Sequence, residues 1–131
     1  MTLARSEAIG SGDLDAALRQ ITETAADILG VGRSSVWRYN DDQTKIVCLS
    51  LFKADTSEHE SGLELDKADF PAYFDAMGAD RIIAAHDAHA DPRTSEFSDI
   101  YLIPFGISLL LDALIRVGGR MIGVTCNEQV G

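Results

Sequence analysis

The chain has 131 residues, enough for one domain with its own hydrophobic core. It carries 11 Lys and Arg against 21 Asp and Glu, a formal net charge of −10 with no basic run. Nucleic-acid binding depends on cations that neutralise phosphates, so this balance argues against a nucleic-acid partner. No apolar run approaches the roughly 20 residues of a membrane-spanning helix. The two cysteines form no disulfide framework and no secretory leader is present, which favours a cytoplasmic protein.

The first half of the chain predicts one helix and several strands. Residues 1–10 are expected to form a weakly structured lead before a single domain over 11–131. Apolar residues recur at helical spacing from Leu14 to Leu29, with Ser11 or Asp13 as the N-terminal cap and Gly30 as the stop. Strands are predicted over 34–40, 45–53 and 63–65, with a turn at 41–44 and a polar, mobile loop over 54–62.

The second half predicts two short helices and three strands. A helix over 70–78 begins near Pro71 and ends at Gly78, and a short strand follows at 81–85. The polar segment 86–93 is predicted to form a loop. Residues 94–102 are predicted to form a helix that ends before Pro104 and Gly106.

A hairpin closes the sequence and turns at Gly118-Gly119, because two glycines readily adopt the positive φ of a tight turn. A two-residue loop places Ile115 opposite Ile122 and Leu111 opposite Cys126. In this register, one face of the hairpin is entirely apolar. It consists of Leu111, Ala113, Ile115, Ile122, Val124 and Cys126. The opposite face, which includes Asp112, has mixed polarity.

The order of elements predicts an α+β fold. Strands joined by tight turns form an antiparallel sheet, and helices at the start and in the middle of the chain imply that both faces are covered. We therefore expect an α/β/α sandwich with a central, mainly antiparallel sheet.

From about Leu14 to Gly131 the chain resembles the GAF domain family, the small-molecule sensory domains of signalling proteins. The resemblance rests on an ordered set of pieces rather than on any single motif. These are Phe70-Pro-Ala-Tyr-Phe, Ile82-Ile-Ala-Ala-His-Asp-Ala, Asp91-Pro-Arg, Tyr101-Leu and Leu111-Asp-Ala-Leu-Ile-Arg-Val-Gly-Gly-Arg-Met-Ile-Gly-Val. The similarity is strongest to GAF domains that precede histidine kinase or diguanylate cyclase modules in bacteria. Members usually continue into a C-terminal helix, so the resemblance implies a domain truncated after Gly131.

The chemistry within this resemblance favours binding over catalysis. His86, Asp87 and His89 could bind a metal, but their segment reads as a loop and an aspartate cap, so we assign no metal site. The predicted helix over 94–102 contains no Cys, so covalent attachment of a bilin is not expected, and the cofactor is left open. No catalytic nucleophile motif is present. The resemblance implies that the polar loop and several aromatic residues border a small-molecule pocket, formed by Tyr73, His86, Asp87, Phe97, Tyr101, Phe105 and Ser108.

The resemblance implies a non-catalytic sensory domain that binds a small ligand and passes the signal through terminal helices to an output domain of the same chain. A homodimer through those helices is expected. The alternative is a ligand-free dimerisation and relay module, whose pocket is filled by its own side chains.

Overall fold

The computed structural model describes residues 14–131. Its first element is helix α2 (Leu14–Leu29), which packs against the neighbouring strands β1 (Arg33–Tyr39) and β2 (Lys45–Lys53). The amphipathic helix predicted from apolar spacing is confirmed, and Gly30 follows it with a φ of +66°. The proposed caps Ser11 and Asp13 and the lead over 1–10 lie outside the described residues.

Seven strands form one sheet in which every neighbouring pair is antiparallel. The order is β3-β2-β1-β7-β6-β5, and β4 also pairs with β2. The remaining strands are β3 (Glu58–Glu60), β4 (Glu64–Asp66), β5 (Ile82–Ala85), β6 (Ile107–Val117) and β7 (Arg120–Val130). The segment 54–62 was expected to be a loop, but its centre forms β3, with His59 paired to Phe52 of β2.

The other helical segments are shorter. Helix α3 (Pro71–Asp80) continues past Gly78, where the sequence predicted its end, and stops at Arg81 with a φ of +68°. Residues 95–105 change geometry along their length, through η2 (Ser95–Phe97), a wide π-helical turn η3 (Ser98–Leu102) and the short α4 (Ile103–Phe105). Pro104 therefore lies inside this segment, because proline is tolerated in the first turn of α4, and Gly106 ends it with a φ of +67°.

The predicted turn of the closing hairpin is confirmed, but the predicted register is wrong beyond it. Val117 pairs with Arg120 across Gly118 and Gly119, which have φ values of +58° and +78°. A bulge at Ile115/Arg116 then leaves Ile122 without an opposite residue. Beyond the bulge, residues 109–115 of β6 therefore each pair with the residue of β7 one position further along than predicted. Because side chains alternate between the two faces of a sheet, the side chains of β7 then lie on the opposite face relative to those of β6.

The all-apolar face of the hairpin therefore does not exist. Asp112, rather than Leu111, pairs with Cys126, and it is only 3% exposed. Leu111 points to the opposite face and is 41% exposed. The buried face of the hairpin instead combines apolar and acidic side chains: Leu110, Asp112, Val124, Cys126 and Glu128.

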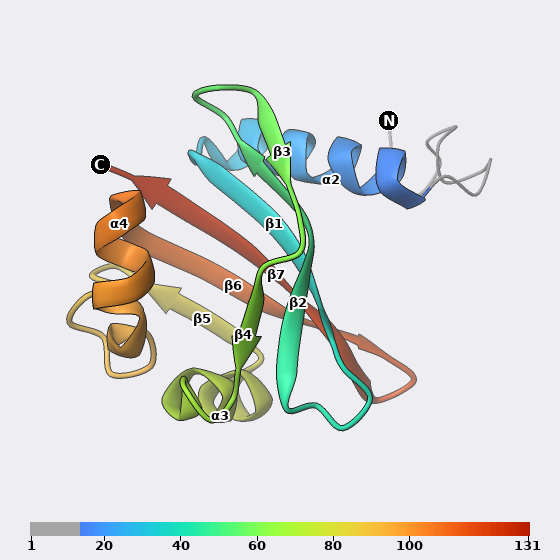
Figure 1. Cartoon of the computed structure of the whole chain (residues 1–131), viewed down its shortest axis with the longest axis vertical. Coiled ribbons are helices and arrows are strands. Elements are labelled where there is room, and N and C mark those ends of the chain that lie inside the picture. Colours follow the sequence, from blue (N-terminus) through green and yellow to red (C-terminus); the bar gives the residue numbers. More distant parts are fainter. Residues whose placement is uncertain (1–13) are drawn as a thin grey trace.

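The main core lies between the sheet and the layer of α3, η2 and η3. It includes Trp37, Tyr73, Phe97 and Leu102, all nearly inaccessible to solvent. Alternation along β1 directs Val36, the neighbour of Trp37, to the face that α2 covers. Figure 1 shows α2 beside β1, with α3 and α4 near β5 and β6. The predicted α+β sandwich with helices on both faces is confirmed.

Candidate functional site

A small cavity lies in the main core, between the sheet and the aromatic layer above it. Its volume is about 20 Å³. A space of this size admits about one water molecule. Its walls come from β1, β4, β6 and β7 and from the helical layer: Trp37, Leu65, Tyr73, Phe97, Tyr101, Leu110, Asp112, Cys126 and Glu128.

Aromatic rings form the upper wall and hold one another in place. Phe97 stacks on Phe70, with ring centroids 4.3 Å apart, and meets the edge of Tyr73 at 4.9 Å. Tyr101 continues the row, 6.1 Å from Phe97 and 5.3 Å from Phe105. Edge-to-face contacts of this kind add to the energy of apolar burial, so the wall is a packed layer.

Two polar clusters reach the floor of the cavity, the first through Asp112 and Cys126 and the second through Glu128. In the first, the hydroxyl of Tyr73 donates a hydrogen bond of 2.6 Å to Oδ2 of Asp112 and lies 3.8 Å from Sγ of Cys126. The second carboxylate oxygen of Asp112, Oδ1, is buried and has no hydrogen-bond partner among the described residues. An unsatisfied buried polar atom carries a free-energy cost, so this oxygen is an unused acceptor at the cavity.

The second cluster is a buried ion pair with a bridging phenol. Nε of Arg33 donates to Oε1 of Glu128 at 3.1 Å, and Nη2 of Arg33 donates to the Tyr101 hydroxyl at 3.2 Å. That hydroxyl donates in turn to Oε1 of Glu128 at 3.0 Å. The guanidinium also lies 4.6 Å from the centre of the Phe105 ring. A buried pair satisfied in this way fixes the relative positions of β1, β7 and η3.

Burial shifts the ionisation of these groups. Burial, with a further contribution from the charge of Glu128, raises the pKa of Asp112 to about 7. Burial also raises the pKa of Glu128, and Arg33 offsets part of that rise. The pKa of the Cys126 thiol is raised well above its ordinary value by burial and by Asp112, and burial raises that of Cys48 to about 11. Both thiols are therefore neutral near pH 7 and are poor nucleophiles.

Three of the residues predicted to bind a ligand, Tyr73, Phe97 and Tyr101, come together in the cavity wall. Phe105 lies at the outer end of the aromatic row, in contact with Tyr101 and Arg33, and is 44% exposed. Whether any of them binds a ligand stays a prediction.

The other three predicted residues lie elsewhere. His86 lines an apolar groove of about 300 Å³ on the sheet face that α2 only partly covers, next to Leu109 and Leu111. Asp87 is exposed, and its Oδ1 accepts a hydrogen bond of 3.3 Å from the Ala90 N–H, as a turn-capping aspartate does. The Ser108 hydroxyl donates to the carbonyl of Gln129 at 3.4 Å. The structure therefore does not bring these three to the cavity.

Sequence reasoning missed Arg33, Asp112 and Glu128. The assumed register assigned Asp112 to a face of mixed polarity, where an acid needs no explanation. Its position between apolar neighbours in a strand was the available signal, since charged residues are almost never buried without a partner. Nothing local in the sequence links Arg33 with Glu128, which are paired across β1 and β7.

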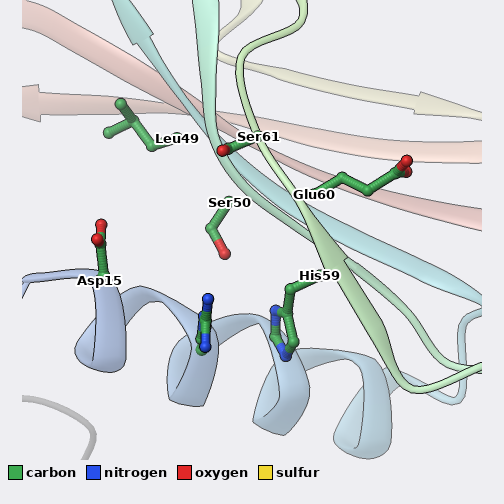
Figure 2. A pocket seen from close by; sticks show the side chains of 7 residues that line it. Asp15, Leu49, Ser50, His59, Glu60 and Ser61 are labelled. Carbon is green, nitrogen blue, oxygen red and sulfur yellow. The ribbon is translucent and has the colours of Figure 1, made fainter.

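A larger hollow of about 210 Å³ lies on the other side of the sheet, between α2 and the β2–β3 edge. Figure 2 shows His59 and Ser50 pointing toward the helix there, with Asp15 facing them from α2. Two of its polar side chains already have partners, His59 with Glu23 at 2.8 Å and Glu60 with Lys53 at 3.1 Å. The walls lack the apolar surface typical of small-molecule sites, so the core cavity is the stronger candidate.

Within residues 14–131, no group of three or more His, Cys, Asp or Glu side chains is arranged to hold a metal ion. His89 instead joins its loop to η3, through the Ser98 hydroxyl at 2.7 Å, and to the start of β6, through the Ile107 carbonyl at 3.1 Å. The same residues form no helix that is both long enough and apolar enough to cross a membrane.

An antiparallel sheet between helical layers, with an aromatic cavity over its central strands, defines a small α+β sandwich domain. The GAF domain model matches residues 13–129, and the chain belongs to this family. A comparison with curated proteins found no match.

Solved structures show the same fold at low sequence identity. The phycocyanobilin-bound GAF domain of a cyanobacterial phytochrome aligns with a TM-score of 0.74 and 14% identity, over 98% of this chain and 78% of that one. The GAF domain of an Acinetobacter phosphoenolpyruvate-protein phosphotransferase aligns with a TM-score of 0.64 and 10% identity, over 88% of this chain and 65% of that one. The free methionine-R-sulfoxide reductase of Neisseria meningitidis, in complex with its substrate, aligns with a TM-score of 0.64 and 13% identity, over 97% of this chain and 66% of that one. The chain thus spans about two thirds of the last two proteins.

Proposed function

We propose that this GAF domain is the non-catalytic sensor of a bacterial signal-transduction protein, and that the aromatic cavity is its ligand site. The observation that carries the proposal is the pair of polar clusters in the cavity floor. Three ionisable side chains are buried where apolar residues would stabilise the fold at least as well. Polar groups that converge on an aromatic cavity are typical of a small-molecule site.

The ionisation of the cysteines supports a binding role. Relatives with this fold include a methionine sulfoxide reductase. Redox or nucleophilic chemistry at cysteine begins with a thiolate. Here burial raises the pKa of both thiols, so neither supplies a thiolate near neutral pH.

In this proposal, ligand binding alters the contacts of Tyr101, which joins the helical layer to β7 through Glu128. A ligand shifts the domain between two conformations only by its difference in affinity for them. The terminal helices would carry that shift to an output module, of which a histidine kinase or a diguanylate cyclase is the expected kind. The cytoplasm is the expected location.

The small volume of the cavity favours a second function. At about 20 Å³, the space is nearly filled by the side chains of the domain itself. A relay module without a ligand would have this property, since its core only needs to transmit movement between the terminal helices.

A matched pair of variants separates the two functions. Tyr101→Phe removes the hydroxyl that joins Arg33 and Glu128, whereas Tyr39→Phe removes a buried hydroxyl whose residue does not line the cavity. We would screen a metabolite library by thermal shift and native mass spectrometry on the wild type and both variants. A sensor predicts a compound whose binding weakens in Tyr101→Phe and persists in Tyr39→Phe. If no compound binds the wild type, or if Tyr101→Phe binds every hit unchanged, the ligand site is refuted and the relay function is favoured.

A further inference from the structure

We infer that the cavity recognises a primary ammonium group, with the Asp112 carboxylate as its counter-ion. This inference rests on the proposed sensory function and names the chemical class of its ligand. It follows from three independent properties of the cavity, namely its charge balance, its unused acceptor and its aromatic wall.

The first property is a charge imbalance. The fully buried charged residues of the described chain are two carboxylates, Asp112 and Glu128, and one guanidinium, Arg33. Arg33 is engaged by Glu128 at 3.1 Å, which leaves Asp112 without a cation. A buried charge without a counter-ion is strongly unfavourable, so Asp112 either binds a proton or gains a cationic ligand.

The second property is the direction in which Asp112 can accept. Its Oδ2 accepts from the Tyr73 hydroxyl at 2.6 Å, whereas Oδ1 has no partner within hydrogen-bond distance among the described residues. Besides Tyr73, the Cys126 thiol and the Asn127 N–H lie close enough to the carboxylate to lower its pKa. An N–H donor on a cation satisfies both the charge and the vacant lone pair, and charge-assisted hydrogen bonds of this kind are the strong ones. An anionic ligand would instead face two carboxylates.

The third property is the shape and chemistry of the wall. Trp37, Tyr73, Phe97 and Tyr101 line the space. Aromatic rings attract a cation at their faces through their quadrupoles. The volume of about 20 Å³ matches a group about the size of water. An ammonium head fits these limits, whereas a quaternary ammonium is larger and carries no N–H donor.

Protons compete for the same oxygen. The groups facing Asp112 are the Tyr73 hydroxyl from α3, Cys126 and Glu128 from β7, and, through Glu128, the Arg33 and Tyr101 cluster. The pKa of Asp112 is about 7, so its charged form dominates only above neutral pH. Binding of the ammonium group should therefore strengthen as the pH rises from 6 to about 8, while the amine itself stays protonated.

Trp37 provides the readout, because it is the single tryptophan of the chain and lines the cavity. We would titrate the whole chain with methylammonium chloride at pH 8 and follow Trp37 fluorescence and the melting temperature at constant ionic strength. A probe with so few atoms should bind in the millimolar range. We expect a saturable change in fluorescence and a rise in melting temperature, neither of which tetramethylammonium or sodium chloride reproduces.

Asp112→Asn tests the assigned counter-ion, with the exposed Asp75→Asn as a matched control. Loss of a charge-assisted hydrogen bond should weaken methylammonium binding by about tenfold or more in Asp112→Asn and leave Asp75→Asn unchanged. Equal responses in the two variants would overturn the inference. If Asp112→Asn does not fold, an equal response of the wild type to methylammonium and tetramethylammonium would overturn it as well.

The outcome separates this inference from the proposed function. If methylammonium has no effect but a library compound binds and requires the Tyr101 hydroxyl, the ammonium assignment fails and the sensor remains. If neither binds, the relay module replaces both.

Discussion

Asp112 shows how a single residue links stability to ionisation in this domain. It occupies the middle of a largely apolar strand, between Leu111 and Ala113, and only 3% of its surface is exposed. Its hydrogen bond to Tyr73 compensates only one of its two oxygens. Its environment therefore favours the protonated acid.

This environment predicts a pH dependence of folding that Asp112→Asn should remove. The folded-state pKa of Asp112 is about 7, above its ordinary value of 3.8, so folding takes up a proton between these two values. The stability from this group is fully present below about pH 4 and is lost as the pH rises through about 7. From pH 5 to 8, the free energy of unfolding of the wild type should fall by roughly 1–3 kcal/mol more than that of Asp112→Asn.

Urea unfolding at several pH values measures this difference, with Asp75→Asn again as the exposed control. Titrating groups that lie far from Asp112 affect all three proteins equally and cancel in the comparison, so the difference reports Asp112 together with the buried groups that interact with it. Parallel pH profiles for the wild type and Asp112→Asn would show that Asp112 is ionised normally.

At the scale of elements, the sheet depends on a close approach between β1 and β7. Gly123 pairs with Arg38, and a Cβ atom at this position would clash with the carbonyl oxygen of Trp37. The atoms nearest to this Cβ belong to the backbone of Trp37 and Arg38 in β1. Because β1 and β7 are central strands of the sheet, this backbone cannot shift without a large cost in free energy. The bulge that leaves Ile122 unpaired lies directly beside this contact.

Gly123→Ala should therefore destabilise the fold, whereas Gly78→Ala should stabilise it. A Cβ at Gly78 in α3 meets no atom within 4 Å, and alanine favours a helix over glycine by about 1 kcal/mol. Overpacking at Gly123 should cost about 1–3 kcal/mol or more. Chemical denaturation of both variants checks the pair, and an unchanged stability for Gly123→Ala would mean that β1 and β7 separate easily.

For the molecule as a whole, α2 covers only part of its face of the sheet. It packs on β1 and β2, while apolar side chains of β5 and β6 on that face stay exposed: Ile82 at 57%, Leu109 at 38% and Leu111 at 41%. Helix α2 itself exposes Ile28 at 75%. An apolar surface that extends over neighbouring elements is typical of an interaction site.

We expect the chain to dimerise through this surface, with α2 at the contact. Ile28→Glu should shift the protein toward a monomer, because a charge would be buried at the contact. Val117→Glu at the tip of the closing hairpin is the control, since Val117 is similarly exposed at 65% but lies away from α2. Light scattering coupled to size exclusion measures the mass of each, and a wild type that is monomeric at high concentration would refute the prediction.

The sequence alone determined the elements whose signals are local. Helical spacing predicted α2, paired glycines predicted the turn of the last hairpin, and alternating apolar residues predicted strands close to their observed positions. The resemblance to GAF domains also predicted that Tyr73, Phe97 and Tyr101 lie together over one face of the sheet, and all three are buried in the core there.

Only the tertiary structure decided the register and the polar floor of the cavity. A bulge depends on backbone contacts with β1, which no pattern within the hairpin records, and it moved Asp112 from an assumed mixed face into the core. Arg33 and Glu128 are 95 residues apart in sequence and meet only because β1 and β7 are neighbours. A pattern of apolar residues identifies which elements are buried, but long-range pairing determines which charges are buried with them.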